Sequence, residues 1–165
     1  MDYYRYHDSE AISVPAAAEV SDGLYVGNYL GALDVLRTRH LDYVISLCRT
    51  GIELDGSASS GMKHIEVWLN DTVEYRWNPN LPHLLETAAQ TLNSLLSQRK
   101  TLLVHCVVGR SRSIALASYA LALRENKPFD EVLLTITEQL PPVQLGPVVD
   151  AARELFAKRG EYFAV

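Results

Sequence analysis

Residues 101–113 read TLLVHCVVGRSRS, and this stretch decides the fold. The run at 101–105 is almost wholly apolar, which is typical of a strand covered on both faces at the centre of a parallel sheet. The following segment, 111–124, is rich in alanine and leucine and predicts a helix. A buried strand that leads directly into a helix indicates an α/β fold, with a central, mostly parallel sheet flanked by helices.

Short apolar runs alternate with helical patterns along the rest of the chain. Their β-branched and aromatic content predicts strands at 23–26, 43–47 and 64–68. Helical patterns lie at 32–40, 81–98, 129–139 and 144–158. The alternation of the two kinds of segment supports the α/β assignment.

The composition is that of an ordinary globular domain. With 165 residues, 48% of them hydrophobic and 21% charged, the chain can bury a core and is unlike disordered proteins. No internal repeat interrupts it, so we expect a single domain at 21–160, between an N-terminal arm at 1–20 and a C-terminal tail at 161–165. The arm is either a packed peripheral segment or a site of regulation by phosphorylation of its tyrosines, Tyr3, Tyr4 and Tyr6.

Acidic residues outnumber basic residues by 20 to 15, which gives a net charge of -5. A broad binding surface for nucleic acid or anionic lipid is therefore not expected, and any bound anion must be held at a local site. The sequence has no apolar run long enough for a membrane span and no basic start typical of a signal peptide. Two cysteines are too few for a disulfide framework, so we expect a cytoplasmic protein, with the nucleus as an additional compartment.

The chemistry is expected where the central strand meets the helix. Cys106 is followed by five residues and then by Arg112, a spacing at which the loop can curl with its backbone N–H groups pointing inward. Such a loop at a helix N-terminus binds anions. Gly109 permits a backbone angle that a Cβ would oppose. The Arg112 guanidinium can donate two parallel hydrogen bonds to a tetrahedral oxyanion.

Cys106 is the expected nucleophile, because a thiolate above inward-pointing N–H groups is stabilised as an anion at neutral pH. The Ser113 hydroxyl is placed to donate to this sulfur and to ease its departure from a phosphocysteine intermediate. For His105 we expect a structural role, in which the ring hydrogen-bonds loop carbonyls, and general-base catalysis is the alternative.

Residues 105–113, HCVVGRSRS, match the pattern H-C-x-x-G-x-[ST]-R-[ST] of the cysteine-dependent protein tyrosine phosphatases. The short chain resembles the dual-specificity branch of that superfamily over residues 20–158, which include the family's opening strand at 22–28. The resemblance implies a hydrolase without metal or cofactor. Its substrates would be phosphotyrosine, and phosphoserine or phosphothreonine, in proteins, and its intermediate a cysteinyl phosphate.

A general acid must protonate the leaving group as the P–O bond breaks. Family members carry this acid on a loop, often in an Asn-Asp-Thr context, and the resemblance assigns it to Asp71 in the run NDT at 70–72. The same carboxylate would then activate water. Its rivals are Asp55, Glu66 and Glu74, and an aspartate that only caps a turn is the alternative for Asp71.

Substrate contacts are expected from the loop positions Val107, Val108, Gly109, Arg110 and Ser111. The two valines are neutral, whereas phosphoinositide phosphatases of the superfamily often have lysines in this loop, so a phosphoprotein substrate is favoured. Arg110 either attracts an acidic peptide or a second phosphate or is a solvated surface residue. Three aromatic residues near the acid either stack on a phosphotyrosine ring or pack under the loop: Trp68, Tyr75 and Trp77.

Cys48 follows the strand at 43–47 and is expected near Cys106, because parallel strands bring their carboxyl ends to one edge of the sheet. It is either a buried spectator or, as in some relatives that include a lipid phosphatase, a partner that traps the oxidised nucleophile as a disulfide.

Two other functions remain open at this stage. One is the same chemistry on a non-protein phosphate, such as a phosphoinositide, a phosphorylated glucan or an RNA 5′ end. The other is a phosphate-binding module without turnover. The presence of Cys106, Arg112, Ser113 and Asp71 argues against the second.

Overall fold

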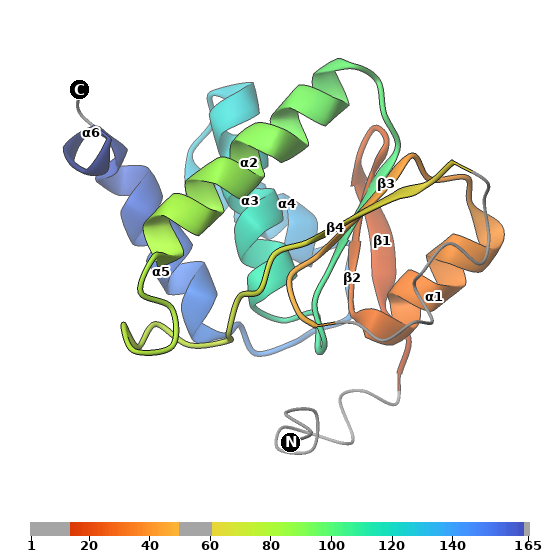
Figure 1. Ribbon diagram of the computed structural model, residues 1–165, viewed down its shortest axis with the longest axis horizontal. Coiled ribbons are helices and arrows are strands. Elements are labelled where there is room, and N and C mark those ends of the chain that lie inside the picture. Colours follow the sequence, from red (N-terminus) through yellow and green to blue (C-terminus); the bar gives the residue numbers. More distant parts are fainter. Residues whose placement is uncertain (1–13, 50–60, 164–165) are drawn as a thin grey trace.

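In the computed structural model, which describes residues 14–49 and 61–163, a five-stranded sheet separates two layers of helices (Figure 1). The strand order is β1 (Ala17–Ser21), β2 (Leu24–Gly27), β5 (Leu102–His105), β3 (Tyr43–Ser46) and β4 (Lys63–Glu66). Only the β1–β2 pair is antiparallel. The predicted α/β fold with a mostly parallel sheet is therefore confirmed, and β5 is its fully buried central strand.

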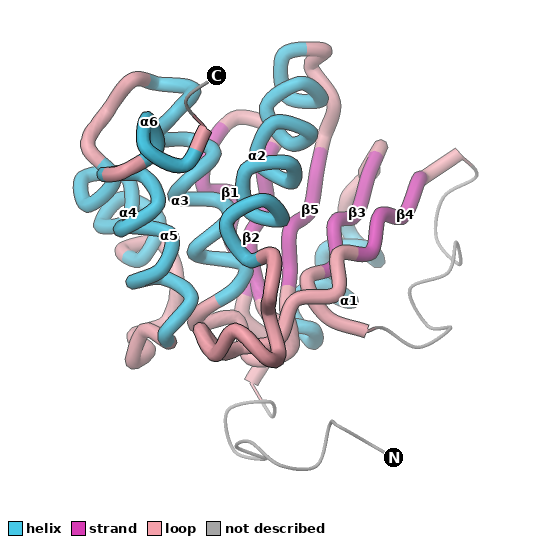
Figure 2. Tube along the Cα trace, turned by 60° about the vertical axis from the view of Figure 1, so that its left-hand side comes forward, coloured by secondary structure: helices cyan, strands magenta, loops and turns pink. Residues whose placement is uncertain are grey.

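Helices cover the sheet unequally, as Figure 2 shows. One face carries α1 (Tyr29–Thr38), whose Ala32 and Val35 pack in a small core with Leu103 of β5. The larger core on the other face includes Leu102 and Val104 of the same strand, because successive strand residues point to opposite faces. Its helices are α2 (Leu81–Ser97), α3 (Arg112–Glu125), α4 (Phe129–Thr137), α5 (Pro147–Ala157) and α6 (Arg159–Tyr162).

The α3 helix has no polar face along most of its length, because every side chain from Arg112 to Ala122 is buried. It packs against α2, α4 and α5, and its many alanines let these neighbours approach closely. A helix enclosed in this way presents its first turn at a fixed place. The loop that precedes it, residues 106–112, is consequently anchored to the core.

The structure differs from the sequence-based expectation at both ends of the domain. Residues 17–20, which the sequence places in an arm, belong to β1. This edge strand lies so close to the start of α1 that a Cβ on Gly31 would come within 2.2 Å of the Ala16 carbonyl oxygen. At the other end, α5 starts at Pro147 instead of 144, and residues 159–162 form the short helix α6. Tyr3, Tyr4 and Tyr6 lie outside the described residues.

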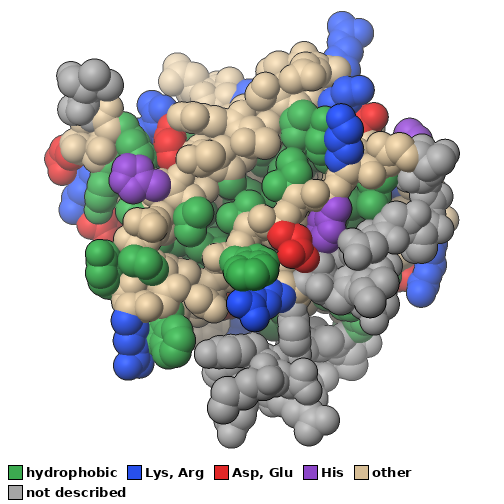
Figure 3. All heavy atoms as spheres, viewed as in Figure 1, with side chains coloured by type: hydrophobic (Ala, Val, Ile, Leu, Met, Phe, Trp, Pro, Cys, Tyr) green, Lys and Arg blue, Asp and Glu red, His purple; other side chains and the backbone are tan. Residues whose placement is uncertain are grey.

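No helix within residues 14–49 and 61–163 is long and apolar enough to cross a membrane. On the face drawn in Figure 3, acidic and basic side chains are scattered among apolar ones.

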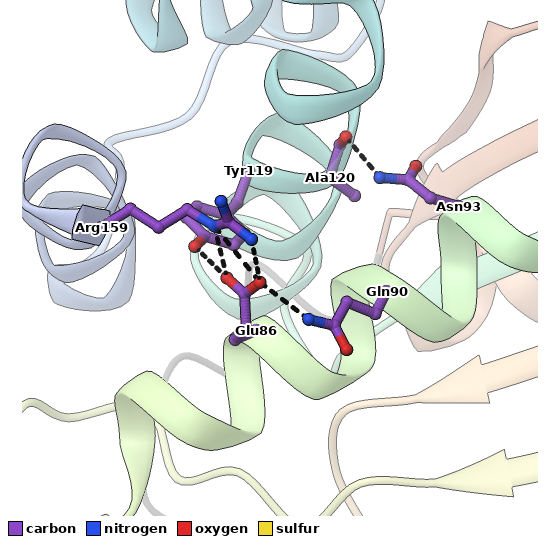
Figure 4. A network of polar contacts seen from close by, with 6 residues as sticks. All are labelled: Glu86, Gln90, Asn93, Tyr119, Ala120 and Arg159. Carbon is purple, nitrogen blue, oxygen red and sulfur yellow. Dashed lines mark hydrogen bonds and ion pairs between the residues drawn. The ribbon is translucent and has the colours of Figure 1, made fainter. Parts of the chain in front are cut away.

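A buried carboxylate joins three helices (Figure 4). Glu86 of α2 is only 5% exposed, accepts hydrogen bonds from Tyr119 of α3 and Gln90, and forms an ion pair of 2.7 Å with Arg159 of α6. Burial alone would raise the pKa of Glu86, but the donors, Arg159 foremost, outweigh it and lower this pKa below its ordinary value of 4.5. Burial and the neighbouring carboxylate raise the pKa of Tyr119, which keeps its hydroxyl a donor.

We predict that Glu86→Gln lowers the free energy of unfolding at pH 7 by about 2 kcal/mol, because hydrogen bonds to a charged acceptor are lost inside the protein. A group with a lowered pKa stabilises the fold above its ordinary value and loses this effect as the pH falls. The gap between wild type and variant should therefore shrink below pH 4.5 in urea titrations. The matched control is Glu154→Gln, which breaks an exposed pair with Lys158 and should cost about 0.5 kcal/mol or less. Equal losses for the two variants would contradict the prediction.

Candidate active site

The carboxyl ends of three parallel strands lie side by side at one end of the sheet, the lower end in Figure 1. Gly27 of β2 and Ser46 of β3 both pair with His105 of β5, so the residues that follow each strand meet there. Loops at the carboxyl ends of parallel strands are the usual binding face of such sheets. The chain places the 106–112 loop, hereafter the Cys106 loop, at the middle of this end.

The Cys106 sulfur lies beneath its own loop and is 1% exposed. The backbone N–H of Gly109 donates to Sγ at 3.2 Å, and the Ser113 hydroxyl lies 3.3 Å from it. Ser113 also lies 3.2 Å from the Gly27 carbonyl, so its single hydrogen can serve either the carbonyl or the sulfur.

Gly109 has a positive φ of 78°. A Cβ there would lie 2.9 Å from the backbone N and the Cβ of Asn28, so both the angle and the close packing require glycine. Asn28 is fixed in turn, because its side chain accepts from the N–H of Gly31 and of Ala16 and donates to Val14. Sequence reasoning missed this support for the Cys106 loop. The available signal was an asparagine directly before a helix.

Arg112, at the first turn of α3, is 9% exposed. Its Nη1 donates to the carbonyl oxygens of Leu47 and Leu69, at 3.0 and 2.9 Å. Its Nε is buried and has no partner among the described residues. The backbone N–H groups of Val107, Val108 and Ser111 likewise donate to no described group. A buried guanidinium N–H without a partner, together with loop amides at a helix N-terminus, fits an oxyanion.

His105 is fully buried and lies in a chain of hydrogen bonds that ends at the Cys106 loop. Its Nε2 is 2.6 Å from the Ser46 hydroxyl, which is 2.7 Å from Nε2 of His64, and its Nδ1 is 3.3 Å from the Cys106 carbonyl oxygen. Burial lowers the pKa of His105 to about 4, so the ring is neutral at pH 7. The neutral ring can donate from Nδ1 and accept at Nε2. This position suits the structural role expected for His105.

Asp71 lies on the loop between β4 and α2, and its side chain is exposed. Its Oδ1 is 3.4 Å from the position that a Cβ on Gly146 would take, and that same Cβ would lie 2.5 Å from Cβ of Ser111. The Asp71 carboxylate is therefore next to the Cys106 loop. Of its rivals, Glu74 pairs with Arg76 at 2.8 Å, Glu66 accepts from the indole of Trp68, and Asp55 lies outside the described residues.

Asn78 is the second support that sequence reasoning missed. It is 4% exposed, its side-chain amide donates to the carbonyls of Asn70 and Thr72, and its Oδ1 accepts from the Asn70 N–H at 3.0 Å. These hydrogen bonds fix the backbone of the residues on both sides of Asp71. Of the two asparagines that the sequence suggests as the cap of α2, Asn80 takes the N-cap position, although its side chain makes no capping hydrogen bond.

Other predicted site residues take different positions. The Ser111 hydroxyl accepts from the N–H of Val148 at 3.2 Å. Arg110 is half-buried and its carbonyl accepts from Gly146 at 3.0 Å. The aromatic residues that the sequence places near Asp71 are exposed: Trp68 61%, Tyr75 77% and Trp77 46%. The guanidinium of Arg49 stacks 4.2 Å above the Trp68 ring.

Comparison with solved structures assigns the fold. A mouse protein assigned to the dual specificity phosphatases, solved with zinc tungstate, superposes with a TM-score of 0.69, 22% identity and coverage of 94% of both chains. Human DUSP28 gives a TM-score of 0.69 and 18% identity over 90% of this chain and 96% of its own. PTPMT1 in complex with PI(5)P gives 0.62 and 16% identity over 88% and 97%.

The chain therefore shares its fold with these dual specificity phosphatases and with PTPMT1, as the resemblance in sequence predicts. No protein-family model and no curated protein matched the chain.

We predict that tungstate stabilises the protein through the free Nε of Arg112 and the loop amides. At a tungstate concentration of 100 times Kd the free energy of unfolding should rise by about 2.7 kcal/mol. Arg112→Lys keeps the charge but loses Nε and the planar fork, so its gain should nearly vanish. The matched control is Arg37→Lys, an exposed arginine on α1 whose gain should equal that of wild type. Urea titrations with and without tungstate measure each gain, and an unchanged gain for Arg112→Lys would refute this assignment.

Proposed function

We propose that the protein is a phosphatase that hydrolyses phosphotyrosine, and phosphoserine or phosphothreonine, in phosphoproteins through a phosphocysteine intermediate. The observation that carries this proposal is the buried Nε of Arg112, which has no partner among the described residues. It lies on the same loop as a sulfur held by an amide and a hydroxyl. An anion site directly above a nucleophile is the arrangement that transfer of a phosphoryl group requires.

In the first step the Cys106 thiolate attacks phosphorus, an S–P bond forms and the ester P–O bond breaks. The Arg112 guanidinium and the loop amides bind the three equatorial oxygens, whose negative charge is stabilised in the transition state. The carboxyl of Asp71 gives its proton to the departing oxygen, which leaves as an alcohol or a phenol.

In the second step the Asp71 carboxylate takes a proton from a water molecule while the oxygen of this water attacks phosphorus. The S–P bond breaks and inorganic phosphate is released. Cys106 returns to the thiolate, and the Ser113 hydroxyl, 3.3 Å from this sulfur, would turn its hydrogen from the Gly27 carbonyl to the sulfur. No metal or cofactor takes part in this scheme.

A phosphoprotein substrate agrees with the charges near the loop. Val107 and Val108 are neutral and the chain carries a net charge of -5, which disfavours an anionic membrane surface. The competing possibility is an inositol lipid, since PTPMT1 shares the fold and was solved with PI(5)P. Turnover measured side by side on phosphopeptides, PI(5)P vesicles, a phosphorylated glucan and RNA with a 5′ phosphate distinguishes the substrates.

We predict that Cys106→Ser abolishes hydrolysis of an aryl phosphate, because no thiolate remains to form the intermediate. Asp71→Asn should lower kcat by about 10²- to 10⁴-fold for substrates with poor leaving groups and far less for good ones. The matched control is Glu74→Gln, a neighbouring carboxylate paired with Arg76, which should keep wild-type kinetics. Full turnover by Cys106→Ser would rule out the covalent route, and a loss in Glu74→Gln equal to that in Asp71→Asn would rule out Asp71 as the acid.

We also propose that Cys48 traps oxidised Cys106. Cys48 is 4% exposed, and burial, followed by the nearby Cys106, raises its pKa to about 12. After peroxide converts Cys106 to the sulfenic acid, the Cys48 thiolate would attack that sulfur, so that the S–S bond forms, the S–O bond breaks and the hydroxide leaves as water after taking a proton from solvent. Because few Cys48 thiols are ionised at pH 7, the reaction should be slow there.

We predict that the bridged fraction after a fixed exposure to peroxide rises steadily from pH 6 to pH 9, as the thiolate fraction of Cys48 increases below its pKa of about 12. Mass spectrometry of alkylated digests measures it. Cys48→Ser should give no bridge and more sulfinic Cys106. Sulfinic Cys106 with fully reduced Cys48 at every pH would eliminate the trapping role.

A further inference from the structure

Among the described residues, a pocket of about 330 Å³ lies beside the Cys106 loop. Its walls come from four places far apart in the sequence: Val14 and Ala16 before β1, Asn28 before α1, residues 108–110 of the Cys106 loop, and residues 140–144 after α4. The last segment runs along the lower edge of the molecule in Figure 1, where the sheet ends. The pocket therefore belongs to the same face as the nucleophile, yet nothing in the proposed reaction uses it.

The walls of the pocket are mostly apolar. Val14 and Val143 line it and are 59% and 43% exposed, while Leu140 is nearly buried. Asn28, whose side chain also lines it, has its amide engaged by Val14, Ala16 and Gly31 and offers little to a polar ligand. Exposed aliphatic side chains around a concave surface favour an apolar ligand.

The pocket is rigid and is connected to the Cys106 loop. Pro141 and Pro142 form one wall, and their rings fix the backbone φ. The segment that carries them is tied down at its end, where the Gly146 N–H donates to the Arg110 carbonyl at 3.0 Å and the Val148 N–H to the Ser111 hydroxyl at 3.2 Å. A preformed pocket of this kind costs little conformational entropy when a ligand enters.

We propose that this pocket, hereafter the apolar subsite, binds an apolar side chain of the phosphoprotein substrate within three residues of the phosphorylated one. This inference rests on the proposed function. Its basis is continuity with the anion site, because Gly109 lines the subsite and its N–H lies 3.2 Å from the Cys106 sulfur. Since consecutive Cα atoms are about 3.8 Å apart, a peptide whose phosphate reaches this sulfur places its next residues over the subsite.

The test uses the full chain and phosphotyrosine peptides in a serine background. Leucine is placed at each of the three positions on either side of the phosphotyrosine, one position per peptide, and kcat/KM is compared with that of the all-serine peptide. Turnover of an aryl phosphate, which has no flanking residues, is measured in parallel. We expect leucine at one position to raise kcat/KM by about tenfold, as an apolar contact in a pocket does.

The informative variant is Val143→Asp, which places a charge in the subsite at an exposed position and should reduce the leucine preference to about twofold or less. The matched control is Leu134→Asp on α4, an equally drastic change at a side chain that is 59% exposed and outside the subsite. It should keep the preference. A preference that survives Val143→Asp would overturn the assignment.

Other outcomes also decide the question. Equal kcat/KM for all peptides, with normal turnover of the aryl phosphate, would refute the subsite and leave the proposed function intact, whereas no turnover of the aryl phosphate would refute both. Sedimentation with phosphatidylcholine–phosphatidylserine vesicles that Val143→Asp abolishes would assign the pocket to a lipid and overturn the proposal.

Discussion

The two hydrogen bonds from Nη1 of Arg112 connect three segments at the carboxyl end of the sheet. They reach Leu47 at the end of β3 and Leu69 at the start of the loop that carries Asp71, while Arg112 itself starts α3. A buried guanidinium without acceptors would be very costly, so these carbonyls must stay where they are. The same bonds fix the plane of the group and thereby aim its unpartnered Nε. The side chain that we propose to bind the anion thus also connects the segments that form the site.

Two buried asparagine side chains hydrogen-bond the backbone of the irregular segments, where no strand pairing satisfies it. Asn28 binds backbone groups of Val14, Ala16 and Gly31, and Gly109 packs directly against it. Asn78 binds backbone groups on both sides of Asp71. Buried loops otherwise leave backbone polar groups unsatisfied, and an amide can both donate and accept. The Cys106 loop is therefore supported by a buried asparagine from before α1, and the backbone around Asp71 by a buried asparagine further along the same loop.

The sequence predicted what depends on local pattern. The central strand, its parallel neighbours and the helix after the Cys106 loop follow from apolar runs and periodicity, and the structure confirms them. It did not predict β1, whose residues AAEVS show no clear alternation and whose place is set by contact with Gly27 and Gly31. The roles of Asn28 and Asn78 also depend on contacts between distant segments, and the sequence did not predict them. Their partners are fixed by the folded backbone, and a residue's own neighbours in sequence carry little sign of them.

The two proposed reacting groups need different surroundings: the sulfur of Cys106 needs to be shielded from water, and the carboxylate of Asp71 needs to reach it. Cys106 must keep its charge on sulfur away from competing solvent, and it is buried over the enclosed helix α3. Asp71 must exchange protons with a leaving group and then with water, and it is exposed on a loop. That loop is nevertheless fixed on both sides of Asp71, by Arg112 at Leu69 and by Asn78 at Asn70 and Thr72. An exposed carboxylate on a fixed backbone can thus work with a buried sulfur, because only its side chain has to turn between the two steps.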